Sequence, residues 1–315
     1  MTILSVCICT CRRAKGLDRL LQALSTQIGG DHEVVVVNDG SHDNSYGEVT
    51  QRHAGLIRYV VHESNEGIAK ARKTAALNAS GEFLVYIDDD CVPPAWWLDW
   101  LQARLDAHPE LDIVAGPVLP LPPDSGETFR SRMQGHFGFL PKVYGTGKSM
   151  IFPTANVCIR RQLMMDIGMF GFPGPFFGAG EDTEFAVRAQ LAGARMFADN
   201  AWHVRHEVGE PMRSLVRRYY RYGYSNGSMI ALSTSPEAHD YIYTMRYSRL
   251  HEQLRHFMQM TWTQSKTFQG SRFEKTAAFV AALFVHMVYQ FACIRGMKQS
   301  RRKGSLTGAF RNSSA

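Results

Sequence analysis

Residues 83–90 read FLVYIDDD, a run of five apolar residues followed at once by three aspartates. Residues 33–40 read EVVVVNDG and follow the same plan, with β-branched residues ending in a polar turn. A continuous apolar run of this length, without polar alternation, is typical of a strand covered on both faces. The polar residues after each run therefore stand where a strand leaves its sheet.

The neighbouring segments extend this pattern in both directions. Two further strands are predicted at residues 3–9 (ILSVCIC) and 56–63 (LIRYVVHE). Helices are predicted where leucines recur at positions 17, 20, 21 and 24, and over residues 67–79, which are rich in good helix formers. The order strand, helix, strand, strand, helix, strand predicts an α/β domain with a mixed, mostly parallel sheet.

The later part of this domain carries weaker signals. Residues 116–126 contain four prolines and are predicted to form a connecting loop, whereas residues 153–160 (PTANVCIR) are predicted to form a strand. Residues 170–180 are rich in glycine and proline, which predicts a mobile loop. A helix is expected from Glu181 to a stop at Gly193, followed by one last strand in residues 195–206.

Composition limits the class of protein. The chain has 315 residues, of which 45% are hydrophobic and 20% charged, so we expect a large core and no extended disorder. The six cysteines lack zinc-site spacing and are interpreted as buried, reduced thiols of a cytosolic protein. The sequence begins in a strand pattern, with no signal peptide expected.

The net charge of +6 is concentrated toward the end of the chain. We predict a first domain over residues 1–208 and a helical, basic extension over residues 209–315. A basic extension suits an anionic partner such as a membrane surface or a nucleic acid, and we favour the membrane and expect no nucleic acid.

Three adjacent carboxylates, Asp88, Asp89 and Asp90, are the first candidate site. Open α/β sheets bind ligands at the carboxyl ends of their strands. Packed acids repel one another unless a cation neutralises them, and hard oxygen ligands favour Mg²⁺ or Mn²⁺. The structural alternative is a solvated acidic turn.

Other candidates lie at the same predicted edge of the sheet. Asp39 follows a strand and can accept hydrogen bonds from a nucleobase or a ribose. The structural alternative is that Asp39 only forms a turn before Gly40. Gly67 opens a helix whose N-terminus favours phosphate, with Asn65 before it and Arg72 within it. The alternative for this helix is an exposed surface helix.

Two later segments supply acid–base and metal-ligand chemistry. Glu181 and Asp182 start a helix after the glycine-rich loop. They can be helix-capping acids with a structural role, or one of them can act as a general base. His203 and His206 end the last predicted strand, and either can complete a metal site as a neutral imidazole or be structural.

Taken in order, these motifs resemble the family 2 glycosyltransferases of the GT-A fold over about residues 3–208. The resemblance implies a Rossmann-like nucleotide-binding half, with Asp88 and Asp90 holding Mn²⁺ or Mg²⁺ on the donor diphosphate and Asp39 contacting the base. It places Arg72 in the nucleotide pocket and Asp182 as catalytic base, and it adds a histidine to the metal, for which we favour His206. The remaining expected donor contacts are Thr10, Arg12, Asn65, Gly67, Asp89 and Glu181.

The sequence departs from the family pattern at two points. The first loop reads Thr10-Cys11-Arg12-Arg13, where the family has an aromatic residue that stacks on the base. The QxxRW motif of processive polymerases is missing, which favours transfer of a single sugar.

The function implied is metal-dependent, inverting transfer of one sugar from a nucleotide-diphosphate sugar, by default a UDP-sugar, to an acceptor hydroxyl. The acceptor is expected to be a glycan, a lipid-linked carrier or another hydroxyl compound. Two alternatives stay open: a sugar-1-phosphate nucleotidyltransferase, whose glycine-rich first loop is poorly matched, and an inactive nucleotide-sugar-binding protein.

Residues 276–294 form a 19-residue apolar stretch flanked by basic residues. This is just long enough to cross a bilayer, for which about 20 residues are needed. His286 and Gln290 interrupt it, so three interpretations compete: a spanning helix, a helix in the membrane interface, or a helix packed on the domain. We favour the interfacial helix, which would place a cytoplasmic enzyme at the inner face of the cell membrane.

Overall fold

The computed structural model describes residues 3–30, 32–122, 126–136, 152–170, 180–232 and 250–302. Most of the predicted glycine-rich loop at residues 170–180 lies outside these ranges. The chain divides into two units: residues 1–119, 141–171 and 181–206 form the first, and residues 120–140, 172–180 and 207–315 form the second. The boundary predicted at residue 208 is not tested by this division and stays a prediction.

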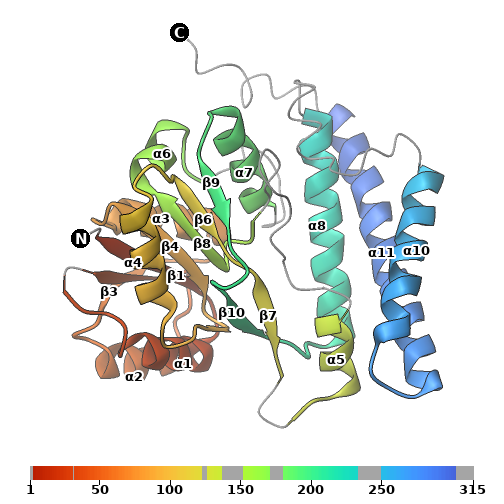
Figure 1. The fold of residues 1–315 in the computed structure, drawn as a ribbon, viewed down its shortest axis with the longest axis horizontal. Coiled ribbons are helices and arrows are strands. Elements are labelled where there is room, and N and C mark those ends of the chain that lie inside the picture. The colour runs from red at the N-terminus through yellow and green to blue at the C-terminus, as the bar shows by residue number, and fades with distance from the viewer. Residues whose placement is uncertain are drawn as a thin grey trace. The chain divides into compact units, whose positions relative to one another are not determined.

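A mixed sheet forms the centre of the first unit (Figure 1). Its strands, in spatial order, are β3 (Ile57–Val61), β2 (Glu33–Asn38), β1 (Leu4–Thr10), β4 (Phe83–Asp88), β8 (Asn156–Arg160), β6 (Ile113–Ala115) and β9 (Met196–Ala198). The first four are mutually parallel, and β8 runs antiparallel to both of its neighbours. The predicted α/β class with a mostly parallel sheet is confirmed.

The apolar runs form strands because both faces of the sheet are covered. Alternate residues Val34 and Val36 enter one hydrophobic core, and Val35 and Val37 enter the other. Burial of a valine side chain contributes about 1.5–3 kcal/mol, so a strand with both faces apolar is stable only in this central position.

Helices supply those two cores. The cores on the two faces draw on α1 (Ala14–Leu24), α2 (Ser45–Arg52) and α4 (Trp97–Ala107) on one side, and α3 (Ile68–Asn78), α6 (Arg161–Asp166) and α7 (Glu181–Leu191) on the other. Leu17, Leu20, Leu21 and Leu24 are fully buried, as their spacing predicted. Gly193, with φ of 80°, follows α7 as expected.

The structure corrects two predictions. Residues 195–206 form two strands instead of one: β9 ends at Ala198, and β10 (Val204–Glu207) joins a separate sheet of order β5 (Cys91–Val92), β10, β7 (Val118–Leu121). The Asp199 side chain accepts a hydrogen bond from the Ala201 amide, which turns the chain between them. The proline-rich segment predicted as a loop contains β7, and Pro120 is tolerated there because β7 is an edge strand.

The described part of the second unit contains helices α5 (Phe129–His136), α8 (Met212–Leu232), α10 (Leu250–Thr267) and α11 (Arg272–Arg302). Their shared core includes Met133, Leu215, Phe268, Ala282 and Val285. The helical character predicted for the C-terminal region is confirmed.

Helices α8 and α11 approach so closely that glycine is required at their contact. A Cβ atom on Gly223 would lie 2.1 Å from the carbonyl oxygen of Tyr289, and one on Gly227 would lie 1.9 Å from that of Cys293. From the other helix, a Cβ on Gly296 would lie 2.2 Å from the carbonyl oxygen of Tyr224. Three backbone contacts of this kind fix the two helices against each other.

Candidate active site

The candidate site of the first unit lies where the strand order of the sheet reverses. Strand β1 pairs with β2 on one side and β4 on the other, so Thr10 and Asp88 end neighbouring parallel strands. Ligands of open α/β sheets bind at such a switch point, beyond the carboxyl ends of the strands. The predicted edge of the sheet is the one at which most of the candidate residues meet.

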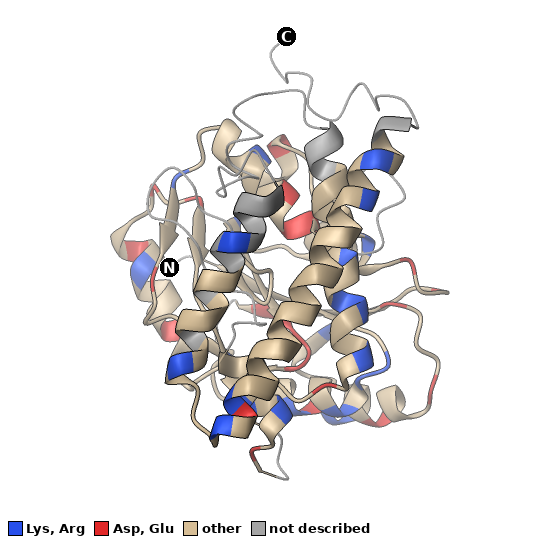
Figure 2. Cartoon of the chain, turned by 90° about the vertical axis from the view of Figure 1, so that its right-hand side faces the viewer, with Lys and Arg blue, Asp and Glu red and all other residues tan. Residues whose placement is uncertain are grey.

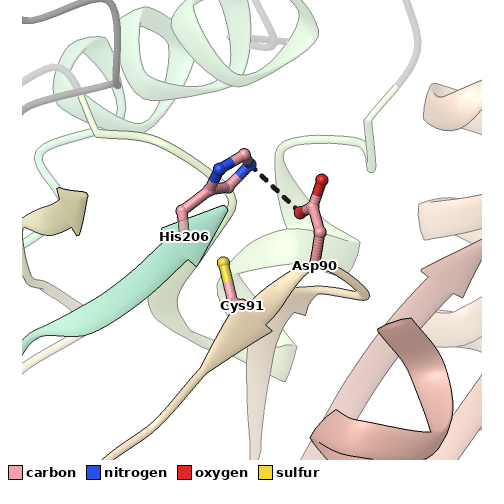
Figure 3. Close-up of side chains that lie close together, drawn as sticks. All are labelled: Asp90, Cys91 and His206. Carbon is pink, nitrogen blue, oxygen red and sulfur yellow. Dashed lines mark ion pairs between the residues drawn. The ribbon is translucent and has the colours of Figure 1, made fainter. Parts of the chain in front are cut away.

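Asp90, Cys91 and His206 converge beyond β4 (Figure 3). Strand β10 runs antiparallel to β5 with His206 opposite Cys91, which brings the imidazole Nε2 to 3.0 Å from Asp90 Oδ1. One ligand atom from each of the three residues lies within 4.8 Å of the other two. The group does not include Asp88, and it includes Cys91, which the sequence analysis did not single out for this role.

Arg13 occupies the same acidic corner. Its guanidinium pairs with Asp90 and lies 3.4 Å from Asp89 Oδ1. Burial raises the pKa of Asp89 to about 6, while Arg13 acts in the opposite direction. The second oxygen of Asp89, Oδ2, is buried without a hydrogen-bond partner among the described residues. Asp90 and His206 offer a carboxylate and an imidazole, which are ligand types that suit a divalent cation.

Arg72 connects the end of β4 to the start of α7. Its buried guanidinium lies 3.1 Å from Asp88 Oδ1 and also pairs with Glu181 Oε1. Burial alone would lower the pKa of Arg72, but Glu181 and then Asp88 raise it, so the guanidinium stays charged. Arg72 and Glu181, both predicted as donor contacts, are therefore partners of each other.

Asp39 organises the loop before α3. Its Oδ1 accepts a hydrogen bond from the Glu66 amide at 2.8 Å, and its Oδ2 accepts one from the Gly67 amide at 2.9 Å. His62 Nδ1 lies 2.8 Å from Oδ1, and the amide of Asn65 is within 3.3 Å of the Asp39 carbonyl. Gly67 has φ of 92°, which other residues rarely adopt. Asp39 thus shapes the helix N-terminus, and its predicted base contact stays a prediction.

Asp182 lies one residue after Glu181 in the first turn of α7. Desolvation raises its pKa to about 7, and the adjacent Glu181 carboxylate adds to the effect. Its Oδ1 accepts a hydrogen bond of 2.7 Å from the Thr183 amide. A carboxyl that titrates near neutrality is suited to accept a proton, as the proposed general base must.

The first loop positions its side chains through Tyr46 and Ser41. Buried Thr10 lies 2.8 Å from the Tyr46 hydroxyl through Oγ1, so its side chain supports the loop. Arg12 has φ of 57°, and its amide donates to Ser41 Oγ. The side chain of Arg12 is exposed to solvent.

The structure distinguishes the two histidines. His203 stacks edge-on against Trp96 at 5.3 Å and bonds the Ala201 carbonyl, whereas His206 lies beside Asp90. Arg13, His62 and Tyr46 were not predicted as site residues. Arg13 follows Arg12 in the quoted motif and His62 lies near the end of a predicted strand, so their positions were visible, but their partners depend on the fold.

Two solved structures share this fold. Mannosyltransferase PcManGT from Pyrobaculum calidifontis, solved in complex with GDP-Man and Mn²⁺, has a TM-score of 0.59 at 17% identity, covering 96% of this chain and 88% of that one. S. aureus TarS 1-349 in complex with UDP has a TM-score of 0.52 at 18% identity, covering 96% and 92%. The fold is therefore of the GT-A glycosyltransferase class.

The sequence comparisons identify the family. The model described as Glycosyl transferase family 2 matches residues 5–168, slightly more than half of the chain. Glycosyltransferase AglE of Haloferax volcanii is 24% identical over 229 residues, 71% of this chain and 72% of the relative. Succinoglycan biosynthesis protein ExoM of Rhizobium meliloti is 29% identical over 178 residues, 54% of this chain and 55% of the relative. The chain belongs to glycosyltransferase family 2 and is a glycosyltransferase.

Proposed function

We propose that this glycosyltransferase moves one sugar from a nucleoside diphosphate sugar to an acceptor hydroxyl in the presence of a divalent cation. The observation that carries the proposal is the convergence of Asp90 and His206, whose facing atoms lie 3.0 Å apart at the end of β4. Asp90 and His206 would hold Mn²⁺ or Mg²⁺, with Asp88 available at the end of β4. A cation held there would neutralise the negative charge that develops on the leaving diphosphate.

The chain's own residues supply the other parts of the reaction. Asp182 accepts the proton of the acceptor hydroxyl, because a carboxyl with a pKa of about 7 is an effective base near neutral pH. Arg72 remains charged and holds Asp88 and Glu181 in position. A single base with a leaving group on the opposite face of the sugar corresponds to one displacement with inversion, as the family resemblance implies.

The donor is proposed to be a UDP-sugar or GDP-sugar. PcManGT was solved with GDP-Man and TarS with UDP, so both bases are compatible with this fold in other proteins. The loop from Asn65 to Gly67, held by Asp39 at the start of α3, offers helix N-terminal amides to a phosphate or ribose. We place the enzyme in the cytoplasm, where nucleotide sugars are made available to such sites.

The proposal is tested by donor turnover. The full chain is assayed for hydrolysis and transfer with a panel of UDP- and GDP-sugars, with Mn²⁺ and with a chelator, alongside Asp90→Ala. We expect Asp90→Ala to abolish turnover, because it removes a proposed ligand of the cation. The fold should stay intact, because Asp90 belongs to neither hydrophobic core.

The matched control is Asp166→Ala, which removes an exposed carboxylate that bonds only Gln162 among the described contacts. Its turnover should equal that of the wild type. Near-normal turnover of Asp90→Ala with Mn²⁺ present would contradict the metal assignment. Release of diphosphate from a sugar 1-phosphate and a nucleoside triphosphate would instead identify a nucleotidyltransferase.

A further inference from the structure

One face of α11 is apolar and exposed to solvent along most of its length. The exposed side chains recur at helical spacing and lie between 47% and 80% exposed: Phe273, Val280, Phe284, Met287 and Phe291. We call these five residues the α11 stripe. It extends about 27 Å at 1.5 Å per residue. Exposed apolar surfaces of this extent mark an interaction site.

An open groove widens the stripe at one end. Its volume is about 520 Å³, and its walls include Met212 of α8 together with Ala277 and Ala281 of α11. Phe273, Val280 and Phe284 of the α11 stripe line the same groove. The apolar surface is therefore continuous and larger than one row of side chains.

Basic residues stand at both ends of the stripe. Arg272 and Lys275 lie at its start, and Arg295 and Lys298 follow its end. Between Lys275 and Arg295 the sequence contains no Asp, Glu, Lys or Arg. Figure 2 shows α11 as a tan helix with blue at either end. Glu274, the acid at the start, is paired with Arg132.

We propose that the α11 stripe lies flat in the interface of an anionic lipid bilayer, with the basic ends at the level of the lipid headgroups. Amphipathic helices of this kind bury their apolar face about 5–10 Å into the headgroup and acyl boundary. Each Lys or Arg near an anionic surface strengthens binding by about 1 kcal/mol, or roughly fivefold. This surface belongs to the second unit and does not depend on the donor or the metal proposed above.

The contact with α8 argues against a helix that crosses the membrane. By length and composition, the segment Arg272–Ser300 could span a bilayer, and an 18-residue window within it has a mean hydropathy of 1.9. However, Gly223 and Gly227 of α8 lie in backbone contact with α11, so α8 would have to accompany it. Helix α8 carries Arg213, Arg217, Arg218 and Arg221, and arginine at a bilayer centre costs about 2.5–3.5 kcal/mol or more.

The charges also argue against pairing of two copies through the stripe. Because both ends are basic, parallel and antiparallel pairs of α11 would each bring a basic end against a basic end. Like charges opposed across an interface are unfavourable, whereas an anionic bilayer complements both ends at once.

Vesicle binding tests the surface. The full chain is sedimented with vesicles of phosphatidylcholine alone and of phosphatidylcholine mixed with phosphatidylglycerol, at low and high salt. We expect strong binding to the mixed vesicles that high salt weakens. The double variant Phe284→Glu, Phe291→Glu should reduce binding at least tenfold, because it places charge in the apolar face. The double variant Arg272→Glu, Lys298→Glu should reduce binding by a similar factor, because each basic residue near an anionic surface contributes to binding.

The matched controls lie in the first unit. Leu77→Glu changes a comparably exposed apolar residue and Lys73→Glu an exposed basic one, and both should bind as the wild type does. Thermal unfolding of every variant checks that the helices remain folded. Wild-type-like binding by the folded Phe284→Glu, Phe291→Glu chain would overturn the proposal.

Depth measurements distinguish a flat helix from a spanning one. Spin labels are placed at Phe273→Cys, Phe284→Cys and Phe291→Cys in a Cys9→Ser, Cys11→Ser background, because both of these thiols are partly exposed. Equal, shallow depths support the flat arrangement, whereas a deep label at 284 with shallower labels at 273 overturns it. A wild-type dimer in solution that Phe284→Glu dissociates would also overturn it, in favour of a second copy.

Discussion

Asp182 and Glu181 are adjacent carboxyls in the first turn of α7, and they have different environments. Glu181 pairs with the buried guanidinium of Arg72, whereas the Asp182 carboxyl accepts a hydrogen bond from the Thr183 amide. Because the acid beside it is held by an arginine, Asp182 is the one of the two that is free to exchange a proton with an acceptor.

The pH dependence of the rate tests this assignment. Since desolvation raises the pKa of Asp182 to about 7, the carboxyl is protonated below that pH and cannot act as a base. We expect kcat/KM to fall about tenfold per pH unit below pH 7. Asp182→Asn should retain donor binding, lower kcat by about 10²–10⁴-fold and flatten this limb of the profile. Loss of donor binding with kcat per bound complex preserved would instead place Asp182 in the donor pocket.

Arg13 and a cation would compete for the same carboxylates. Arg13 pairs with Asp90 and lies 3.4 Å from Asp89, so its positive charge opposes binding of a second cation there. Arg13→Gln is expected to raise Mn²⁺ affinity by about tenfold, which corresponds to about 1.4 kcal/mol. Free Mn²⁺ is measured by electron paramagnetic resonance, with Arg12→Gln, an exposed neighbour, as control. Weaker Mn²⁺ binding by Arg13→Gln would show that Arg13 supports the site instead of competing for it.

The sequence placed most of the candidate residues at one edge of the sheet but did not predict their pairings. Asp39 and Asp88 were placed there because each stands at a predicted strand end, and Arg72 because it lies within the helix that Gly67 opens. That Arg72 pairs with Glu181, or that Asp90 meets Arg13 and His206, depends on segments far apart in the chain. No local pattern encodes such contacts, and the role of Cys91 in the group with Asp90 was missed for the same reason.

At the level of elements, the strands of five or more residues were predicted, whereas the shorter strands β5, β6 and β7 were not. Val34 to Val37 specify β2 by their own composition, because only a central strand can bury both faces. Strand β7 contains Pro120, which reads as a loop unless its position at a sheet edge is known. Helix α2 was missed because its apolar residues are few, whereas α4 was missed although Leu98, Leu101 and Leu105 follow a helical spacing.

Because glycines form the contact between α8 and α11, we predict that alanine at these positions lowers the free energy of unfolding more than alanine at other helical glycines. Gly227→Ala would place a Cβ within 1.9 Å of the Cys293 carbonyl oxygen, so the two helices must separate. We expect a loss of about 1–3 kcal/mol in the free energy of unfolding, the usual range for overpacking.

Gly47→Ala is the matched control for this change. Gly47 lies in helix α2 with no atom within 4 Å of the added Cβ, so alanine should stabilise the chain slightly. Both variants are compared by urea unfolding monitored by circular dichroism. Equal stability of Gly227→Ala and the wild type would mean that α8 and α11 are not in backbone contact.

At the level of the whole molecule, the chain enters the second unit more than once. Residues 120–140 belong to it although the first unit resumes afterwards, and Met133 of α5 is buried with Leu215 and Phe268. A chain ended after residue 208 would therefore lose the partners of α5.

We expect that truncated chain to retain the sheet of the first unit but to expose α5. Limited proteolysis should cut residues 129–136 at least tenfold faster than in the full chain, because the buried contacts that hold α5 are gone. Cleavage rates in the α4 segment, which packs in the first unit, serve as the internal reference. Unchanged protection of α5 would show that the first unit alone holds it.

Arg72 and Glu181 are 109 positions apart, and β8 inserts between β4 and β6 only after residue 156 has been made. Ribosomes add about 5–20 residues per second, so an emerging chain waits roughly 5–20 seconds between these two partners. The nascent polypeptide carries an uncovered β4 edge until β8 has been made, and Arg72 lacks the second of its two carboxylate partners until Glu181 has been made. Open strand edges invite pairing with other chains, so biosynthesis of this enzyme should depend on chaperones that act at the ribosome.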